Sequence, residues 1–235
     1  MSQQTPISYG VCLHSLLPVH ASGDHRSEQV TQLLYGECFM VLQERSDGWA
    51  HIQIRHDGYR GWILAAQAFP IDEEVYEQYG RTQQFCSEMI SYVQWESGRR
   101  QPLLLGSPLI DLSLIYADGA IYHGENYLFK PLSDFARLDN LQEMGSAFLG
   151  APYMWGGRSP FGVDCSGLVQ VLMRMIQVRL SRDASQQAEE GKLVAVEERQ
   201  FGDLAFFRGD SSQRIQHVGI VWHGEQVLHA SARGV

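Results

Sequence analysis

The stretch Pro152-Tyr-Met-Trp-Gly-Gly-Arg-Ser-Pro-Phe-Gly-Val-Asp-Cys165-Ser-Gly-Leu-Val decides the fold of the second half of the chain. It places Cys165 behind a glycine-rich loop and at the start of an apolar pattern with helical spacing. A helix N-terminus carries partial positive charge and unpaired N–H groups, which favour a thiolate and can stabilise an oxyanion. We therefore expect a nucleophilic Cys165 with a lowered pKa, and we expect Gly156, Gly157 and Gly162 to leave space for a substrate backbone.

Two histidines downstream complete a candidate catalytic set. His217 begins the apolar segment His217-Val-Gly-Ile-Val221, and His229 lies near the end of the next short strand. Residues 223–226, His-Gly-Glu-Gln, are typical of a hairpin loop, so the two strands should be antiparallel neighbours. One imidazole could then accept the thiol proton while the other orients it. A zinc site made by the same three side chains, or a buried structural Cys165 beside two ordinary strand histidines, remains the alternative.

The bulk composition limits the class of protein. The chain has 235 residues, of which 44% are hydrophobic and 19% charged, enough for one large or two small packed domains. A net charge of −9 without a basic cluster argues against a nucleic-acid partner. The apolar run Val11–Val19 is broken by His14 and Pro18, and the four cysteines form no C-x-x-C pair. We expect no membrane span, no metal and a cytoplasmic location.

The first 70 residues have the pattern of a small β-barrel. In Trp49–Arg55, apolar and polar side chains alternate with a period of two, which marks a half-buried strand. Asp57-Gly58 supplies hairpin turn chemistry before a return strand. Further short strands are expected at Val30–Leu34, Cys38–Leu42 and Tyr59–Ile63.

Residues 71–132 predict a second small β unit, which could be a degenerate Src-homology-3-like barrel, and the sequence leaves open whether it is a separate domain. Ile71–Tyr79 could form a short helix. Glycine and proline punctuate the remainder, and the expected strands are Phe85–Trp95, Pro102–Leu105, Leu112–Tyr116 and Ala120–His123.

Residues 133–235 predict an α+β domain, with helices first and strands afterwards. The first helix has apolar residues at helical spacing from Leu138 to Leu149 and is stopped by Gly150 and Pro152. The second starts at Asp164 or Cys165. Asp183 and Gln186 form the pattern of a capping box for a third, shorter helix. The strands expected after these helices are Leu204–Phe207, His217–Trp222 and Val227–His229.

Six motifs in order resemble the NlpC-type cysteine peptidases of bacterial cell-wall metabolism, over about residues 134–235. The resemblance implies a papain-like fold, with helices packed on an antiparallel sheet. It also implies Cys165 as nucleophile, His217 as general base and His229 as the orienting third member. The motifs are Tyr153-x-Trp-Gly-Gly, Asp164-Cys-Ser-Gly-Leu, Arg182-Asp-Ala-Ser-Gln-Gln187, Gly202-Asp-Leu-Ala-Phe-Phe207, His217-Val-Gly-Ile-Val221 and His229-Ala-Ser.

The first half resembles bacterial Src-homology-3-like barrels through Leu33-Leu-Tyr-Gly-Glu37 and Gly58-Tyr-Arg-Gly-Trp62. In one branch of the peptidase family such barrels precede γ-D-glutamyl-L-diamino-acid endopeptidases, which require a free N-terminal L-Ala. The resemblance implies that acidic and tyrosine groups hold the substrate amine. The substrate-binding residues it implies are Tyr59, Asp164, Ser166, Tyr153, Trp155 and Glu28.

Each of these residues also has a plainer interpretation. Tyr59 could be an ordinary surface aromatic of the barrel, and Asp164 only the N-cap of its helix. Glu28 could be a solvated loop charge, and Trp155 could simply pack on the helix.

The chain also ends at Val235, soon after His229, whereas relatives carry further strand residues there.

The function expected from the sequence is a cytoplasmic cysteine endopeptidase without cofactor. Its substrate would be a murein tripeptide or tetrapeptide such as L-Ala-γ-D-Glu-diaminopimelate, cleaved during recycling of cell-wall peptides. Two alternatives stay open: an exported peptidoglycan hydrolase whose barrels bind intact cell wall, and a non-catalytic binding module on the same scaffold. An amidase or acyltransferase using the same three residues is a related possibility.

Overall fold

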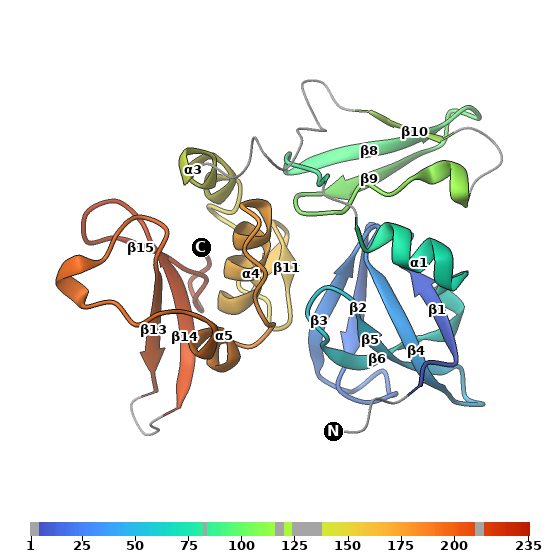
Figure 1. Ribbon diagram of the computed structural model, residues 1–235, viewed down its shortest axis with the longest axis horizontal. Coiled ribbons are helices and arrows are strands. Elements are labelled where there is room, and N and C mark those ends of the chain that lie inside the picture. Colours follow the sequence, from blue (N-terminus) through green and yellow to red (C-terminus); the bar gives the residue numbers. More distant parts are fainter. Residues whose placement is uncertain (1–4, 82–83, 116–119, 124–137, 210–213) are drawn as a thin grey trace. The chain divides into compact units, whose positions relative to one another are not determined.

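The computed structural model describes residues 5–81, 84–115, 120–123, 138–209 and 214–235 (Figure 1). The chain divides into two compact units, residues 1–131 and 132–235. The predicted start of the peptidase domain at residue 133 lies outside the described residues.

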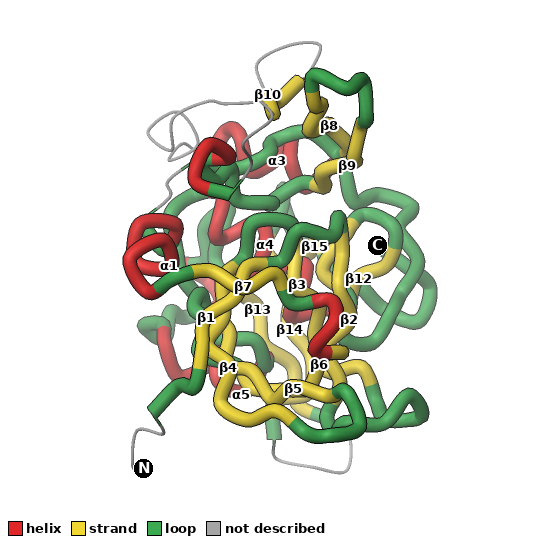
Figure 2. Tube along the Cα trace, turned by 90° about the vertical axis from the view of Figure 1, so that its right-hand side faces the viewer, coloured by secondary structure: helices red, strands yellow, loops and turns green. Residues whose placement is uncertain are grey.

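The first unit begins with a seven-stranded antiparallel sheet. Its strand order is β3-β2-β6-β5-β4-β1-β7, which brings strands distant in sequence side by side (Figure 2). The expected strands are all present, and β1, β2 and β7 are additions that the sequence pattern did not identify. The strands are β1 (Ser8–Val11), β2 (Leu16–His20), β3 (Gln29–Leu34), β4 (Cys38–Glu44), β5 (Trp49–Ile54), β6 (Arg60–Leu64) and β7 (Phe69–Ile71).

The predicted alternation in β5 is confirmed by its burial. Ala50, Ile52 and Ile54 are buried in the core of this sheet, whereas His51 and Gln53 between them are half-buried. A hairpin then joins β5 to β6 as an antiparallel pair. The turn between them depends on Gly58, whose φ of 73° lies in the region that glycine adopts without steric cost.

A helix and a three-stranded sheet follow in the same unit. The helix α1 (Glu73–Tyr79) confirms the predicted short helix. The sheet has the order β10-β8-β9, with β8 (Ile90–Trp95), β9 (Arg100–Leu104) and β10 (Ala120–His123). The strand predicted at Leu112–Tyr116 is wrong as far as it is described, because Leu112–Leu114 form a 3₁₀ turn whose N-cap Asp111 accepts a hydrogen bond from the Ser113 N–H group.

Buried side chains of β8 and β9 belong to one cluster with side chains of the first sheet. Val93 and Leu103, from β8 and β9, are fully buried in this cluster. Val11 and Cys38, from β1 and β4, belong to the same cluster. The two sheets of the first unit therefore share a core, although one sheet lies mainly before residue 70 in the sequence and the other lies after it.

The second unit places its helices before its main sheet, as an α+β domain. The helix α3 (Leu138–Ser146) is followed by turns that end at Gly150, with a φ of 83°. A small hairpin, β11 (Arg158–Ser159) with β12 (Gly162–Val163), leads into α4 (Cys165–Met175). Every residue of α4 is buried, which is typical of a central helix.

The sheet of the second unit has the antiparallel order β13-β14-β15. Its strands are β13 (Leu204–Arg208), β14 (Ile215–Val221) and β15 (Val227–Leu228). Both α4 and the short helix α5 (Ala184–Glu190) pack against β14 (Figure 1). The start of α4 and the central strand of the sheet therefore face each other, and they carry the residues of the candidate site.

Candidate active site

Asp164 fixes the start of α4 and so the place of Cys165. Its side chain caps the helix by accepting a hydrogen bond from the Gly167 N–H group at 2.7 Å. Its other carboxylate oxygen accepts from the Gly156 N–H group at 2.8 Å. The cap leaves Cys165 as the first residue of the helix, as the sequence predicted.

The glycines around Cys165 make room for the protein's own backbone. A Cβ atom on Gly167 would lie 2.2 Å from the Gly157 carbonyl oxygen, and one on Gly157 would lie 2.4 Å from the Gly162 carbonyl oxygen. The loop that carries the β11–β12 hairpin thus packs directly on the first turn of α4. The expectation that Gly157 and Gly162 leave space for a substrate is wrong, because main-chain atoms fill the space beside Gly157 and the Met154 side chain fills the space beside Gly162.

The Cys165 thiol lies against β14. It is hydrogen-bonded by the backbone of Val218, the residue after His217, and it is only 7% exposed. Burial raises the pKa of the Cys165 thiol, and the hydrogen bonds from Val218 and Ser166 oppose this only in part. The expected lowering of this pKa is therefore wrong, since loss of hydration outweighs the hydrogen bonds that favour the thiolate.

The two histidines meet as the spacing predicted. His217 Nε2 and His229 Nδ1 are 2.9 Å apart, and their rings are nearly perpendicular. His217 lies on β14, and His229 follows β15 directly. The strand position between them is Gly219, where a Cβ atom would approach His229 Cβ to 3.0 Å. The absence of that atom lets the two imidazoles share one face of the sheet.

The electrostatics of His217 suit a general base. Burial lowers its pKa, and the neighbouring His229 lowers that pKa further. A neutral His217 whose Nε2–H group donates to His229 Nδ1 keeps its Nδ1 free to accept a proton. The pair can therefore take a proton from a nearby thiol and hold the imidazole in one orientation while doing so.

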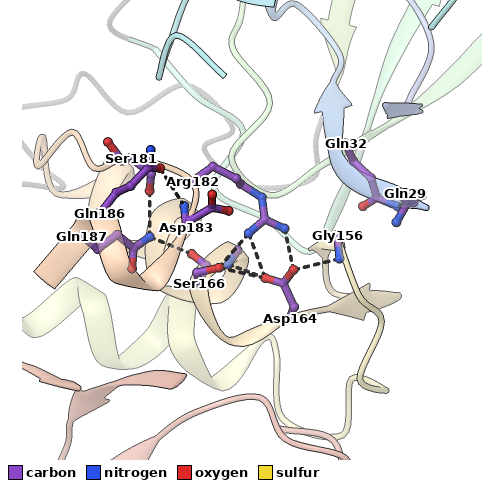
Figure 3. Close-up of polar contacts among 11 residues, drawn as sticks. Gln29, Gln32, Gly156, Asp164, Ser166, Ser181, Arg182, Asp183, Gln186 and Gln187 are labelled. Atoms are coloured by element: carbon purple, nitrogen blue, oxygen red, sulfur yellow. Dashed lines mark hydrogen bonds and ion pairs between the residues drawn. The ribbon is translucent and has the colours of Figure 1, made fainter. Parts of the chain in front are cut away.

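A buried ion pair involves Asp164, the residue before Cys165. The guanidinium of Arg182 binds both carboxylate oxygens of Asp164, at 3.0 and 2.6 Å, and donates to Ser166 Oγ at 2.8 Å (Figure 3). Arg182 is 2% exposed and Asp164 4% exposed. The charge of Asp164 is thus already paired inside the protein.

The remaining predicted substrate residues fall in both units. Burial raises the pKa of Tyr153, and the nearby Cys165 and Asp164 raise that pKa further. Trp155 is 59% exposed on the loop before β11. Tyr59 and Glu28 belong to the first unit. The substrate contacts predicted for these residues and for Asp164 and Ser166 stay predictions.

Comparison with known proteins identifies a domain in each half of the chain. Residues 150–235 match the NlpC/P60 family, and residues 19–67 match a bacterial dipeptidyl-peptidase Sh3 domain. These ranges contain the Cys165 and histidine cluster and most of the first sheet. Residues 150–235 form an NlpC/P60 domain. The chain is a cysteine peptidase built on that domain, which follows a bacterial SH3-type domain, as the motifs predicted.

Relatives of this NlpC/P60 protein align along most of the chain. A "Gamma-D-glutamyl-L-lysine dipeptidyl-peptidase" of Bacillus subtilis is 29% identical over 87% of this chain and 73% of its own length. "Dipeptidyl-peptidase 6" of Lysinibacillus sphaericus is 26% identical over 92% of this chain and 85% of its own length. A crystal structure of an NlpC/P60 family protein from Bacillus cereus has a TM-score of 0.80 at 20% identity, covering 97% of this chain and 92% of its own, which shows the same fold.

The two histidines of the NlpC/P60 domain form a hydrogen bond between His217 Nε2 and His229 Nδ1. Within the described ranges, no group of three or more His, Cys, Asp or Glu residues could hold a metal ion. None of the helices in the described part of the chain has the length and hydrophobicity of a membrane span.

Three residues of the NlpC/P60 domain gain roles that the sequence did not assign. Val218 supplies the backbone contact to the thiol. Phe207 lies opposite His217 on β13, with ring centroids 5.8 Å apart. Arg182 pairs with Asp164. Arg182 and Phe207 stand in motifs already noted, but periodicity cannot pair residues so far apart in the chain.

Proposed function

We propose that this protein hydrolyses the γ-D-glutamyl–diamino acid bond of murein peptides that carry a free N-terminal L-Ala. The observation that carries the proposal is the 2.9 Å contact between His217 and His229 on the strand whose Val218 backbone holds the Cys165 thiol. A nucleophile, a base and an orienting group thus meet at one helix start. The printed names of two relatives, which describe dipeptidyl-peptidases, support a substrate cleaved after its second residue.

In the proposed reaction, His217 Nδ1 accepts the thiol proton as Cys165 Sγ attacks the γ-carbonyl carbon of D-Glu. His229 holds the resulting imidazolium through Nε2 of His217. The tetrahedral intermediate then collapses, and the C–N bond breaks as His217 gives its proton to the leaving amine. A thioester remains on Cys165.

Water completes the proposed cycle. His217 takes a proton from the water, which attacks the thioester carbonyl, and the C–S bond breaks as the proton returns to sulfur. The products are L-Ala-γ-D-Glu and the diamino acid, alone or with its C-terminal residue. N–H groups of the first turn of α4 are available to stabilise the oxyanion in both steps.

The test of this function is direct hydrolysis by the full-length protein. L-Ala-γ-D-Glu-diaminopimelate, the same tripeptide with L-Lys, and an N-acetylated form of each are incubated with the protein, and products are identified by mass spectrometry. We expect L-Ala-γ-D-Glu from the free tripeptides and little or none from the acetylated ones. No dipeptide from either free tripeptide, or equal amounts from Cys165→Ala, would reject the proposal.

We further propose that the protein acts in the cytoplasm, on peptides released during cell-wall turnover. Its four cysteines are all free, which fits a reducing compartment. Retention on purified peptidoglycan sacculi distinguishes this proposal from that of an exported hydrolase whose barrel binds intact wall. Weak retention, together with recovery of the protein in the cytoplasmic fraction of its host, is expected; strong retention and recovery outside the cytoplasm would favour the exported enzyme.

A further inference from the structure

Two side chains from one short segment hold both neighbours of Cys165 (Figure 3). Arg182 donates to both carboxylate oxygens of Asp164 and to Ser166 Oγ, at 2.6 to 3.0 Å. Gln187 Nε2 donates to the Ser166 carbonyl oxygen at 3.1 Å. Because Asp164 and Ser166 flank Cys165, the main chain is held on each side of the sulfur-bearing residue.

The segment that supplies these side chains is itself held firmly. Asp183 and Gln186 form the capping box of α5 that the sequence predicted. The Ser181 N–H group donates to the Glu190 carboxylate at 3.0 Å, and Gln187 Nε2 also donates to the Ser181 carbonyl oxygen at 2.8 Å. The start of α5 is therefore closed on itself, and it presents Arg182 and Gln187 in fixed positions.

The chemistry of Arg182 suits positioning of several acceptors at once. A planar guanidinium presents a rigid fork of donors, whereas a lysine ammonium is a point charge on a flexible stem. Only the fork can bind two carboxylate oxygens and a hydroxyl in fixed directions. With 2% of its surface exposed, Arg182 itself lies beneath the surface and acts through Asp164 and Ser166.

Gln187 carries an independent sign of the same role. It is 1% exposed, and its Oε1 atom has no hydrogen-bond partner among the described protein atoms. A buried acceptor left unpaired costs stability, so an apolar side chain of similar length would suit this position better if packing alone mattered. The amide is useful here for its donor, which reaches the residue after the nucleophile.

We propose that Arg182 and Gln187 are positioning residues, which fix the main chain on both sides of Cys165 and so hold its sulfur against Val218, next to His217. The inference rests on the proposed role of Cys165 as nucleophile. Neither residue contacts the substrate in this account. Their loss should therefore slow the chemical step more than it weakens substrate binding.

The test compares Arg182→Lys and Gln187→Met with Arg174→Lys in the full-length protein. Arg174 is a buried arginine in the last turn of α4, the helix that begins at Cys165. Its replacement therefore measures the general cost of losing a buried guanidinium. For each variant, kcat and KM on the free tripeptide, Tm, and the rate at which iodoacetamide labels Cys165 are measured.

We expect Arg182→Lys to lower kcat about 10-fold or more and Gln187→Met about 3-fold or more, with KM within about 3-fold of wild type. Gln187→Met should keep or raise Tm, because it removes an unpaired buried acceptor. Arg174→Lys should keep kcat within about 2-fold. The inference is overturned if both site variants keep wild-type kcat, or if Arg174→Lys loses as much kcat as Arg182→Lys.

The labelling rate separates this inference from the proposed function. If wild type hydrolyses neither tripeptide, the proposed function fails, and the accessibility of the sulfur still reports its position. We expect labelling of Cys165 to slow about fivefold or more in both site variants, because the sulfur leaves the Val218 N–H group that stabilises its thiolate, and to stay unchanged in Arg174→Lys. Equal labelling rates in all three variants and wild type would contradict the inference.

Discussion

The thiol and the imidazole of the site are both shifted toward their neutral forms. Burial raises the pKa of Cys165, and burial together with His229 lowers the pKa of His217. At neutral pH the resting pair is therefore a thiol and a neutral imidazole rather than a thiolate and an imidazolium. In the proposed reaction the proton therefore moves to His217 during attack, which makes this base essential to the first step.

This resting state predicts the pH dependence of the peptidase. As pH falls, His217 becomes protonated only below its ordinary value of about 6.5, so the acid limb of kcat/KM should have its midpoint below 6.5. As pH rises, Cys165 loses its proton only above its ordinary value of about 8.5, so alkylation by iodoacetamide should increase with a midpoint above 8.5. An alkylation rate already constant from pH 6 upward would show a preformed thiolate and contradict this reading.

Substitution of the histidines should separate their roles. His217→Ala removes the base and should lower kcat about 10²- to 10⁴-fold. His229→Ala removes only the orienting group, so its loss should be smaller, about 10- to 10²-fold. The measurement is kcat on the free tripeptide, with circular dichroism confirming the fold. A larger loss in His229→Ala than in His217→Ala would reverse the assignment.

The motifs that carry the candidate site residues could be recognised in the sequence, but the protonation states of those residues could not. Cys165, His217 and His229 stand in motifs with recognisable spacing. The raised pKa of Cys165 depends on how α4 packs against β14, and that packing is set by contacts distant in sequence. The ion pair of Arg182 with Asp164 was missed for the same reason.

At the scale of the elements, close packing between a loop and a helix fixes the position of Cys165. The first turn of α4 lies against the loop that bears the β11–β12 hairpin, and this approach requires glycine at positions 157 and 167. Interiors at this density do not accept an added methyl group without displacement. The glycines therefore define where α4 starts relative to the loop.

Gly167→Ala tests this packing, because its effect on the free energy of unfolding should be opposite to the effect of the same substitution in an exposed helix. In an exposed helix the substitution would stabilise by about 1 kcal/mol, whereas here the new Cβ would meet a carbonyl oxygen at 2.2 Å. We expect a loss of about 1–3 kcal/mol in urea unfolding, accompanied by lower kcat. Gly191→Ala is the matched control, because nothing lies within 4 Å of its Cβ position. An equal effect of the two substitutions would contradict the packing argument.

Long periodic elements could be predicted, and short ones could not. The apolar pattern after Cys165 identified α4, and the alternation in Trp49–Ile54 identified β5. The two-residue strands β11 and β12 are too short to show a period. Leu112–Leu114 alternates like a strand, but the side chain of Asp111 caps a 3₁₀ turn there instead.

At the scale of the whole molecule, each unit has its own buried side chains. Ile52 is fully buried in the first sheet, and Leu172 is fully buried in α4 of the second unit. Changing either residue to Ala should cost about 2–5 kcal/mol. Hydrogen exchange should show Ile52→Ala loosening the β1–β7 sheet and Leu172→Ala loosening α4 and β14. Exchange that rises equally in both units for either variant would mean that they unfold as one.

The division of the chain was harder to predict than its elements. Local patterns change near residue 70 and predict a second small β unit from residue 71, but they leave open whether that unit is a separate domain. Val93 and Leu103 nevertheless join Val11 and Cys38 in a single buried cluster. Strand patterns show which face of a strand is buried, but not which distant strand covers it, so a core shared between two sheets leaves no local signal.

The central claim is that Cys165 is the nucleophile of this peptidase, and stoichiometric labelling tests it most directly. The other cysteines are at most 5% exposed, and burial raises the pKa of Cys86 to about 12, so iodoacetamide should reach Cys165 first. We predict that tripeptide hydrolysis falls in proportion to label at Cys165, located by peptide mass spectrometry, and reaches zero at one equivalent. Full hydrolysis by protein completely labelled at Cys165 would contradict the claim.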